Sequence, residues 1–238
     1  MSRLSTKPIP PEERLIVAVD VPGHDEALAL VDRLGDTVRF YKLGLELAMS
    51  GRYFELVDAL AARGKQVFAD LKFHDIPNTV AAAVRELSKR GVAFATLHAG
   101  HPPMLEAACA EKGALRLLAV TVLTSVAPEE LRDQGISLSV EELAVARAGH
   151  ALQAGCDGVI ASGVEAAALR AAHGDDFLIV SPGIRPAERA DDQRRVVTPR
   201  QAFENGADYI VVGRPVHAAP DPAAAAAGIQ ATIAEIFG

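Results

Sequence analysis

Residues 66–80 read QVFADLKFHDIPNTV, and this stretch decides how the rest of the chain is interpreted. Its apolar first part is typical of a buried strand, in which successive side chains alternate between the two faces. Asp70 and Lys72 are therefore expected to point the same way from the strand end. Asp75 follows one turn later, where it can fold back toward Lys72. Ile76-Pro77 is expected to start a helix, because proline is well tolerated in a first helical turn and restricts the residue before it.

A lysine between two carboxylates is held in its charged form, because nearby opposite charge favours ionisation. Lys72 would then be a poor Schiff-base nucleophile but a well-placed proton donor. Alternatively, Asp70 and Lys72 form only a solvated ion pair at the strand end, and Asp75 caps the helix. The spacing D-x-K-x-x-D by itself leaves both interpretations open.

The composition is that of a globular protein with a substantial core. Half of the 238 residues are hydrophobic, and single α/β barrels of similar length are common. No apolar run is long enough to span a bilayer. Residues 1–14 are polar and rich in proline, without the apolar centre of a secretory signal. We expect them to form a short N-terminal arm before one catalytic domain at 15–238.

Net charge and cysteine content limit the partners and the cellular compartment that the protein is expected to have. The net charge of −7 argues against nucleic acid or an anionic membrane as a partner. An anionic substrate would then need a local basic pocket. The two cysteines, Cys109 and Cys156, form no metal-binding motif. We expect both to be reduced thiols in the helical core of a cytoplasmic protein.

Short β-branched runs alternate with longer Ala- and Leu-rich stretches of helical period, which is typical of βα units and a parallel sheet. The expected strands are residues 15–19, 40–43, 66–71, 94–98, 115–123, 158–161, 177–181 and 209–212. The expected helices are residues 24–34, 51–62, 79–89, 103–111, 140–154, 165–173, 199–205 and 223–237. About eight such units predict a single (β/α)8 TIM barrel. A doubly wound sheet is the alternative, although no G-x-G-x-x-G follows the first strand.

In a TIM barrel the active residues lie at the carboxyl ends of the strands. Polar residues follow nearly every expected strand, and such a coincidence on one rim indicates a functional site. They are Asp20, Lys42, Asp70, Lys72, His98, Thr124, Ser125, Ser162, Ser181, Arg185 and Arg214.

Gly213-Arg214 follows the eighth strand, where barrels often build a phosphate site. Glycine lets backbone N–H groups approach an anion and arginine offers a bidentate fork. The alternative is a turn glycine beside a surface arginine. Residues 184–197 form a long polar loop, either a lid or a disordered insert. As a lid it would bring Arg185 or Gln193 to the phosphate.

Three other features have weaker functional interpretations. His98 and His101 form H-x-x-H on a strand end rather than a helix, with no evident third ligand, so we expect no metal site. His74 is expected to be structural. Asp20 either caps a turn or binds sugar hydroxyls.

The string from Asp70 to Val80 resembles the signature of the orotidine 5'-monophosphate decarboxylases, a family that catalyses the last step of pyrimidine nucleotide synthesis. Other landmarks occur in the expected order and extend the resemblance from Asp20 to Arg214. They are Val19-Asp20, Tyr41-Lys42-Leu43-Gly44, Val120-Thr121-Val122-Leu123-Thr124-Ser125, Ser181-Pro182-Gly183-Ile184-Arg185, Asp192-Gln193, Arg195-Val196-Val197-Thr198-Pro199 and Val212-Gly213-Arg214-Pro215. Residues 99–104 and 186–191 depart from the family pattern. These departures affect the expected geometry of two loops and not the charged network.

The resemblance implies roles for individual residues. Lys72 would protonate the product carbanion, within a charged network completed by Lys42, Asp70 and Asp75. Asp75 would reach into the site of a partner subunit. The implied substrate-binding residues are Asp20, Lys42, Asp70, Leu71, Lys72, Phe73, His74, Asp75, Ile76, Pro77, Asn78, Thr79, Thr124, Ser125, Arg185, Gln193, Gly213 and Arg214.

The resemblance further implies a cytoplasmic homodimer with sites at its interface. It implies no cofactor, no metal and a nucleotide substrate. Two other functions remain as alternatives. A sugar-phosphate lyase on the same barrel would typically use Mg²⁺ to hold an enediolate. A phosphate-ligand sensor on an inactive barrel would have no use for a desolvated row of two lysines and two aspartates.

Overall fold

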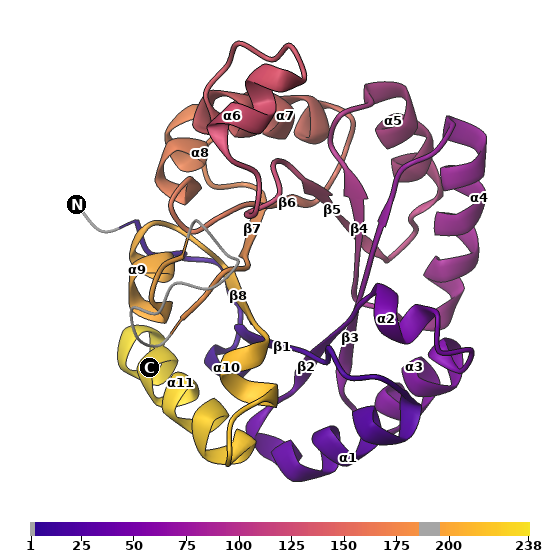
Figure 1. Ribbon diagram of the computed structural model, residues 1–238, viewed down its shortest axis with the longest axis vertical. Helices are drawn as coiled ribbons and strands as arrows, with labels where there is room; N and C mark the ends of the chain where they lie inside the picture. Colours follow the sequence, from indigo (N-terminus) through magenta and orange to yellow (C-terminus); the bar gives the residue numbers. More distant parts are fainter. Residues whose placement is uncertain (1–2, 186–195) are drawn as a thin grey trace.

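A computed structural model describes residues 3–185 and 196–238. The strands form a closed parallel barrel in chain order from β1 to β8, with β8 pairing back onto β1 (Figure 1). This arrangement confirms the TIM-barrel prediction. The strands are β1 (Leu15–Ala18), β2 (Phe40–Leu43), β3 (Gln66–Phe73), β4 (Phe94–His98), β5 (Arg116–Val120), β6 (Gly158–Ile160), β7 (Leu178–Ser181) and β8 (Tyr209–Val212).

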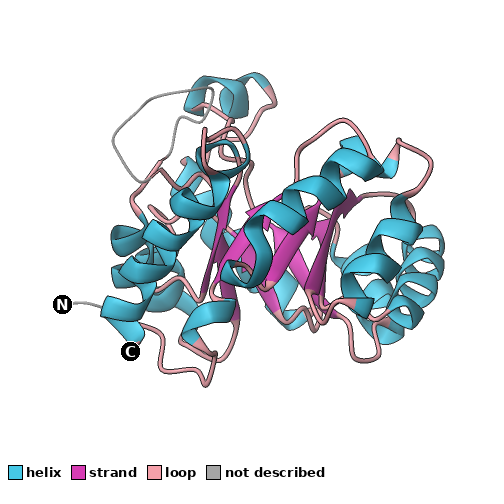
Figure 2. Cartoon of the chain, turned by 90° about the horizontal axis from the view of Figure 1, so that it is seen from below, coloured by secondary structure: helices cyan, strands magenta, loops and turns pink. Residues whose placement is uncertain are grey.

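The helices surround the strands on the outside, as the side view in Figure 2 shows. The longer ones are α1 (His24–Leu34), α3 (Tyr53–Ala62), α4 (Pro77–Leu87), α5 (Pro102–Glu111), α7 (Val140–Gln153), α8 (Ala166–His173) and α11 (Pro222–Phe237). The shorter ones are α2 (Leu45–Ala48), α6 (Pro128–Asp133), α9 (Pro199–Glu204) and α10 (Arg214–His217), with 3-10 turns at Pro11–Glu13, Gly35–Thr37 and Ser88–Arg90. Within the described ranges, no helix combines the length and apolar character needed to cross a membrane.

The barrel interior is filled by aromatic rings in its amino-terminal half. Phe40 and Phe94 lie 4.9 Å apart between ring centroids, and Tyr209 packs edge-on against Phe94 at 5.2 Å. Phe68 also packs edge-on against Phe94, at 5.9 Å. Side chains two residues further along a strand share the same face. The residues that follow these rings therefore point into the barrel mouth above a buried apolar floor.

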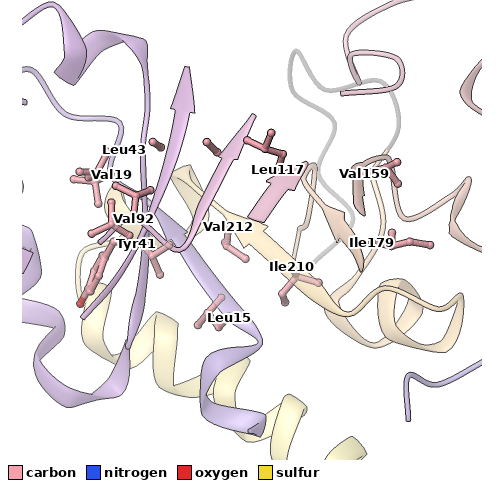
Figure 3. Close-up of a cluster of buried hydrophobic side chains, with 14 of the residues drawn as sticks. Leu15, Val19, Tyr41, Leu43, Val92, Leu117, Val159, Ile179, Ile210 and Val212 are labelled. Carbon is pink, nitrogen blue, oxygen red and sulfur yellow. The ribbon is translucent and has the colours of Figure 1, made fainter. Parts of the chain in front are cut away.

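A second and larger core lies between the strands and the surrounding helices. Outward-facing residues of the strands supply much of it, and Figure 3 shows Leu15, Tyr41, Leu117, Ile179 and Ile210 among its members. Each of these side chains is almost completely buried. Because both faces of the barrel strands are buried, the strands appear in the sequence as continuous apolar runs.

Residues 3–14 pack against the amino-terminal end of the barrel rather than extending into solvent. Asp208 is fully buried there and accepts hydrogen bonds from Arg170 (2.7 Å), Ser5 (2.5 Å) and Lys7 (3.2 Å). Arg14 donates to the carbonyl of Asp208 at 3.1 Å. A buried carboxylate is stable only when it is paired and hydrogen-bonded, so Asp208 ties the N-terminal arm to α8 and β8.

Asp208→Asn is expected to lower the free energy of unfolding by about 3–5 kcal/mol, because it leaves the Arg170 guanidinium buried without its carboxylate partner. The matched control is Asp175→Asn. Asp175 lies 3.7 Å from Arg170 but is 83% exposed, so its loss should cost less than about 0.5 kcal/mol. Urea titrations compare the variants. Equal losses in both would contradict this role of Asp208.

Candidate active site

A cavity of about 280 Å³ opens at the carboxyl ends of the barrel strands. Nine of the eighteen residues that the resemblance implies as substrate-binding line it. They are Asp20, Lys42, Asp70, Lys72, Thr124, Ser125, Arg185, Gly213 and Arg214. Four of these side chains carry positive charge and two carry negative charge. The cavity is therefore locally cationic in a protein whose net charge is −7.

A row of alternating charges crosses the cavity from β1 to β3. Lys42 Nζ lies 3.3 Å from Asp20 Oδ1 and 3.2 Å from Asp70 Oδ2. Lys72 Nζ lies 2.8 Å from the same Asp70 oxygen. Asp20 is half exposed, whereas Asp70 is buried. The row brings together residues from three strands, as the sequence predicted for Lys42 beside Asp70.

The end of β3 is irregular at the point where the sequence suggested simple alternation. Its pairing with β4 shifts register between Ala69 and Phe73, and Lys72 has a φ of 50°. This left-handed conformation costs a non-glycine residue about 1 kcal/mol or more, and such strain concentrates at functional sites. The bulge carries β3 on to Phe73, two residues beyond the predicted strand end, and aims the Lys72 ammonium at Asp70.

Thr96 on β4 stabilises this geometry, and the sequence analysis missed it. Its Oγ1 accepts a hydrogen bond from Lys72 N at 3.0 Å and donates to Asp70 Oδ1 at 2.9 Å. Thr96 is fully buried. Strand alternation could have identified it, because Thr96 follows Phe94 by two residues just as Asp70 follows Phe68. One hydroxyl thus fixes both the carboxylate and the strained backbone.

Asp70 and Lys42, at the centre of this row, each favour the charged form of the other. Burial opposes the charge on Asp70, but Lys42, Lys72 and Thr96 outweigh it and hold the pKa of Asp70 below its ordinary value. Burial likewise opposes the charge on Lys42, but Asp70 and Asp20 raise the pKa of Lys42 above its ordinary value. The Asp70 carboxylate paired with the Lys42 ammonium is therefore the resting state.

Apolar side chains form the rest of the cavity wall. Phe68 lies at its base, and Val122, Ile160 and Val211 face the charged row from other strands and from the loop after β5. The same loop carries Thr124 and Ser125 before it enters α6. An apolar wall with a few polar groups at one edge is typical of a small-molecule site.

The remaining cations lie at the β7 and β8 edge. Arg185 is largely buried and donates from Nη1 to the Ile184 carbonyl at 3.0 Å. Ile184 and Val197 form an isolated parallel β-bridge. Arg214 begins α10 directly after Gly213. Gln193 and most of the predicted loop lie outside the described residues.

Leu71 and the implied substrate-binding residues after Lys72 do not line the cavity of their own chain. The residues concerned are Leu71, Phe73, His74, Asp75, Ile76, Pro77, Asn78 and Thr79. Asp75 is exposed, and its Oδ1 accepts a hydrogen bond from Ile76 N at 2.6 Å. Among the ion pairs of the described residues, Lys72 pairs with Asp70 alone. Of the interpretations that the sequence left open, the described chain does not show Asp75 folded back onto Lys72, because α4 starts at Pro77 and Asp75 bonds locally to Ile76 N.

Other polar strand ends have local structural roles. His101 caps α5 by accepting from Met104 N at 3.1 Å, and the His98 ring lies 5.5 Å from that of His74. Ser162 accepts from Val164 N and Ser181 is buried outside the cavity. In the described part of the chain, no three His, Cys, Asp or Glu side chains are grouped as a metal ion would require.

The closed barrel and the cavity at the carboxyl ends of its strands define a TIM-barrel enzyme. The sequence model of the "Orotidine 5'-phosphate decarboxylase / HUMPS family" matches residues 13–229. The chain belongs to this family, as the motifs around Lys72 predicted.

Named relatives agree with this assignment. The chain is 56% identical over 236 residues to orotidine 5'-phosphate decarboxylase of Methylococcus capsulatus, covering 98% of this chain and 97% of the relative. It is 57% identical over 233 residues to the enzyme of Xanthomonas oryzae pv. oryzae, covering 97% and 96%. The crystal structure of orotidine 5'-phosphate decarboxylase from Lactobacillus acidophilus superposes with a TM-score of 0.82 at 38% identity, over 93% of this chain and 99% of that one.

The lowered pKa of Asp70 predicts an acid-dependent loss of stability. Because its folded-state pKa lies below the unfolded value, the stabilisation is fully present above about pH 5 and is lost as the pH falls through the folded pKa. Urea midpoints measured between about pH 2.5 and 6 should therefore fall more steeply for the parent protein than for Asp70→Asn. Asp58→Asn, at an exposed position of α3, should follow the parent curve. Parallel curves for the parent and Asp70→Asn would contradict a lowered pKa of Asp70 in the folded protein.

Proposed function

We propose that the protein decarboxylates orotidine 5'-monophosphate to uridine 5'-monophosphate, the final step of de novo UMP synthesis, without a metal or cofactor. The observation that carries this proposal is the Lys42–Asp70–Lys72 row at the base of a cationic, partly apolar cavity. The activity named for the relatives at 56–57% identity supports the same reaction.

The cavity offers a place for each part of this substrate. Arg185, Gly213 and Arg214 would hold the phosphate, together with Gln193. Asp20 would accept hydrogen bonds from the ribose hydroxyls. Thr124 and Ser125 would contact the edge of the pyrimidine, whose faces would pack against the apolar wall. This orientation brings the C6 carboxylate to the charged row.

The chemistry follows from the charges in that row. Breaking the bond between C6 and the carboxylate carbon releases CO2 and leaves the electron pair on C6, in the ring plane and with little π delocalisation. The enzyme has to lower this barrier by roughly 20 kcal/mol. Lys72 opposes the developing negative charge electrostatically. It then donates a proton from Nζ to C6 and recovers one from water. Asp70 lies beside the departing carboxylate, and their mutual repulsion ends when neutral CO2 leaves.

The phosphate group contributes although it does not react. Binding energy gained far from C6 can be used to organise the reacting groups, so that it lowers the barrier rather than only tightening ground-state binding. Here Lys42 links the two ends of the cavity, because it pairs with Asp20 on the ribose side and with Asp70 on the reacting side.

We further propose that two copies form a homodimer in which Asp75 and Thr79 complete the partner's site. The segment that carries them is exposed, and it presents Ile76 with 66% of its surface accessible. Met49, in the loop after α2, is 79% exposed. Large exposed apolar side chains beside an incomplete charged network are typical of a surface that another protein covers.

The test is an absorbance assay of orotidine 5'-monophosphate in excess EDTA, with the parent protein and Lys72→Ala. The parent should convert the substrate without a metal. Lys72→Ala should lose about 10³-fold or more in kcat, because it removes both the electrostatic stabilisation and the proton donor. Binding of uridine 5'-monophosphate should largely survive. Lys89→Ala, at an exposed position, should match the parent.

Two results would contradict the proposed reaction. One is turnover by Lys72→Ala within tenfold of the parent rate. The other is no conversion by the parent protein, together with activity on a sugar phosphate that Mg²⁺ restores. The second result would favour a lyase that uses Asp70 as a metal ligand.

The interface role of Asp75 predicts complementation between two inactive variants. After subunit exchange between Lys72→Ala and Asp75→Asn, half of the dimers are mixed and each mixed dimer has one intact site. About one quarter of the parent activity should return, as expected for a two-fold symmetric dimer. Each variant exchanged with itself is the control. No recovery in a mixture shown to contain heterodimers would place Asp75 in the site of its own chain.

A further inference from the structure

Two cysteine side chains that the proposed reaction does not use are in contact on the outside of the barrel. Cys109 Sγ, on α5, lies 3.7 Å from Cys156 Sγ, and 47 positions separate the two residues in the sequence. Both are free thiols. The sequence analysis placed both in helices, but Cys156 lies beyond the end of α7, in the turn that leads into β6.

The backbone on both sides of Cys156 is fixed to the end of α5. Lys112 Nζ donates to the Gly155 carbonyl at 2.7 Å and to Asp157 Oδ2 at 2.8 Å. Asp157 Oδ2 also accepts from Leu117 N on β5 at 2.8 Å. Gly155 has a φ of 93°, which favours glycine. A Cβ built on Gly155 would lie 3.6 Å from Cys109 Cβ, so the turn that carries Cys156 lies close against Cys109.

The two thiols differ in access and in ionisation. Cys109 is partly exposed, whereas Cys156 is 6% exposed. The hydrogen bond between the two sulfur atoms and the Lys112 ammonium lower the pKa of Cys109, and they outweigh partial burial and Asp157, which raise it. The same hydrogen bond and burial raise the pKa of Cys156. Cys109 is therefore the nucleophile of the pair, and Cys156 is positioned to react second.

We propose that Cys109 and Cys156 form a peroxide-reactive dithiol that closes reversibly to an intramolecular disulfide. The Cys109 thiolate attacks one oxygen of hydrogen peroxide, the O–O bond breaks, and the products are a sulfenic acid and hydroxide, which takes up a proton to become water. The Cys156 sulfur then attacks Cys109 Sγ. The S–S bond forms, the S–O bond breaks, and the thiol proton leaves with hydroxide as a second water. Both thiols are oxidised and one peroxide is reduced.

The geometry makes the second step favourable. A disulfide requires the two sulfur atoms to approach by about 1.7 Å from their present contact, since the S–S bond is about 2.05 Å long. The new bond would join α5 to the turn between α7 and β6. Neither cysteine lines the catalytic cavity. Oxidation should therefore stabilise the fold by restricting the unfolded chain while leaving the active site unchanged.

The test treats the reduced full-length protein with hydrogen peroxide and follows thiol content and intact mass. The parent should lose both thiols and two hydrogens in mass without gaining oxygen, and dithiothreitol should reverse the change. Tm should rise by roughly 5 °C or more in the oxidised form. The rate of turnover of orotidine 5'-monophosphate should stay within about twofold, as expected for a bond remote from the reacting groups.

Three variants distinguish the roles of the two thiols. Cys156→Ser should accumulate a sulfenic acid on Cys109 that dimedone traps. Cys109→Ser should react slowly, because Cys156 is buried and held as the thiol. Lys112→Gln should slow the peroxide reaction of the parent pair. If Cys109→Ser aggregates, Cys109→Ala provides the same comparison.

Several results would overturn the proposal. They are persistence of both thiols in the parent, a sulfinic acid on Cys109 with Cys156 unchanged, or a disulfide that forms only between chains. An unchanged Tm after complete oxidation would overturn the stabilising role. These readouts do not depend on the decarboxylation reaction, so the two proposals fail independently.

Discussion

The Asp70 carboxylate is buried in the mouth of the barrel, and the structure of the site depends on how this charge is compensated. A lone carboxylate at this depth would take up a proton, because desolvation disfavours the ionised form. Two ammonium groups within 3.2 Å and the Thr96 hydroxyl prevent this. The compensation is mutual, since the buried Lys42 ammonium also requires carboxylates. Removing one member therefore leaves another charge unsatisfied.

The aromatic rings below this row keep water away from it. Phe40, Phe68, Phe94 and Tyr209 pack across the barrel. The charged residues Lys42 and Asp70 lie only two positions beyond Phe40 and Phe68 on the same strands. Electrostatic interactions are stronger where water is excluded. A sharp boundary between an apolar floor and a polar mouth therefore strengthens the influence of each charge on a bound ligand.

The sequence predicted the features that repeat and missed those that depend on contacts between distant residues. Three strands and one long helix begin and end at their predicted residues, because their apolar periods are regular. The helices α2, α6 and α10 span only a turn or so each, too short for a period to show. The bulge at Lys72 arises from pairing with β4, and Thr96 gains its role from the same pairing.

Most of the candidate site could be predicted from residue type and position along the chain. The part that could not be predicted has a physical reason. Lys42, Asp70, Lys72, Arg185 and Arg214 lie together because the barrel brings the carboxyl ends of all strands to one rim. Asp75 differs, because a local turn decides its direction, and the described residues of a single chain give it no charged partner in the cavity. Sequence spacing alone could not separate a contact within the chain from one across an interface.

The packing of the N-terminal arm also brings the two ends of the described chain together. Arg3 N donates to the Glu204 carbonyl at 2.9 Å, and the Arg14 guanidinium lies 3.8 Å from the ring centroid of Phe237 at the end of α11. The first and last described segments thus meet at the end of the barrel opposite the cavity. The two ends of the described chain are therefore adjacent. Domains with adjacent ends often tolerate circular permutation. The order in which the βα units are connected is therefore separable from the chemistry at the mouth, which requires only that the eight strand ends converge.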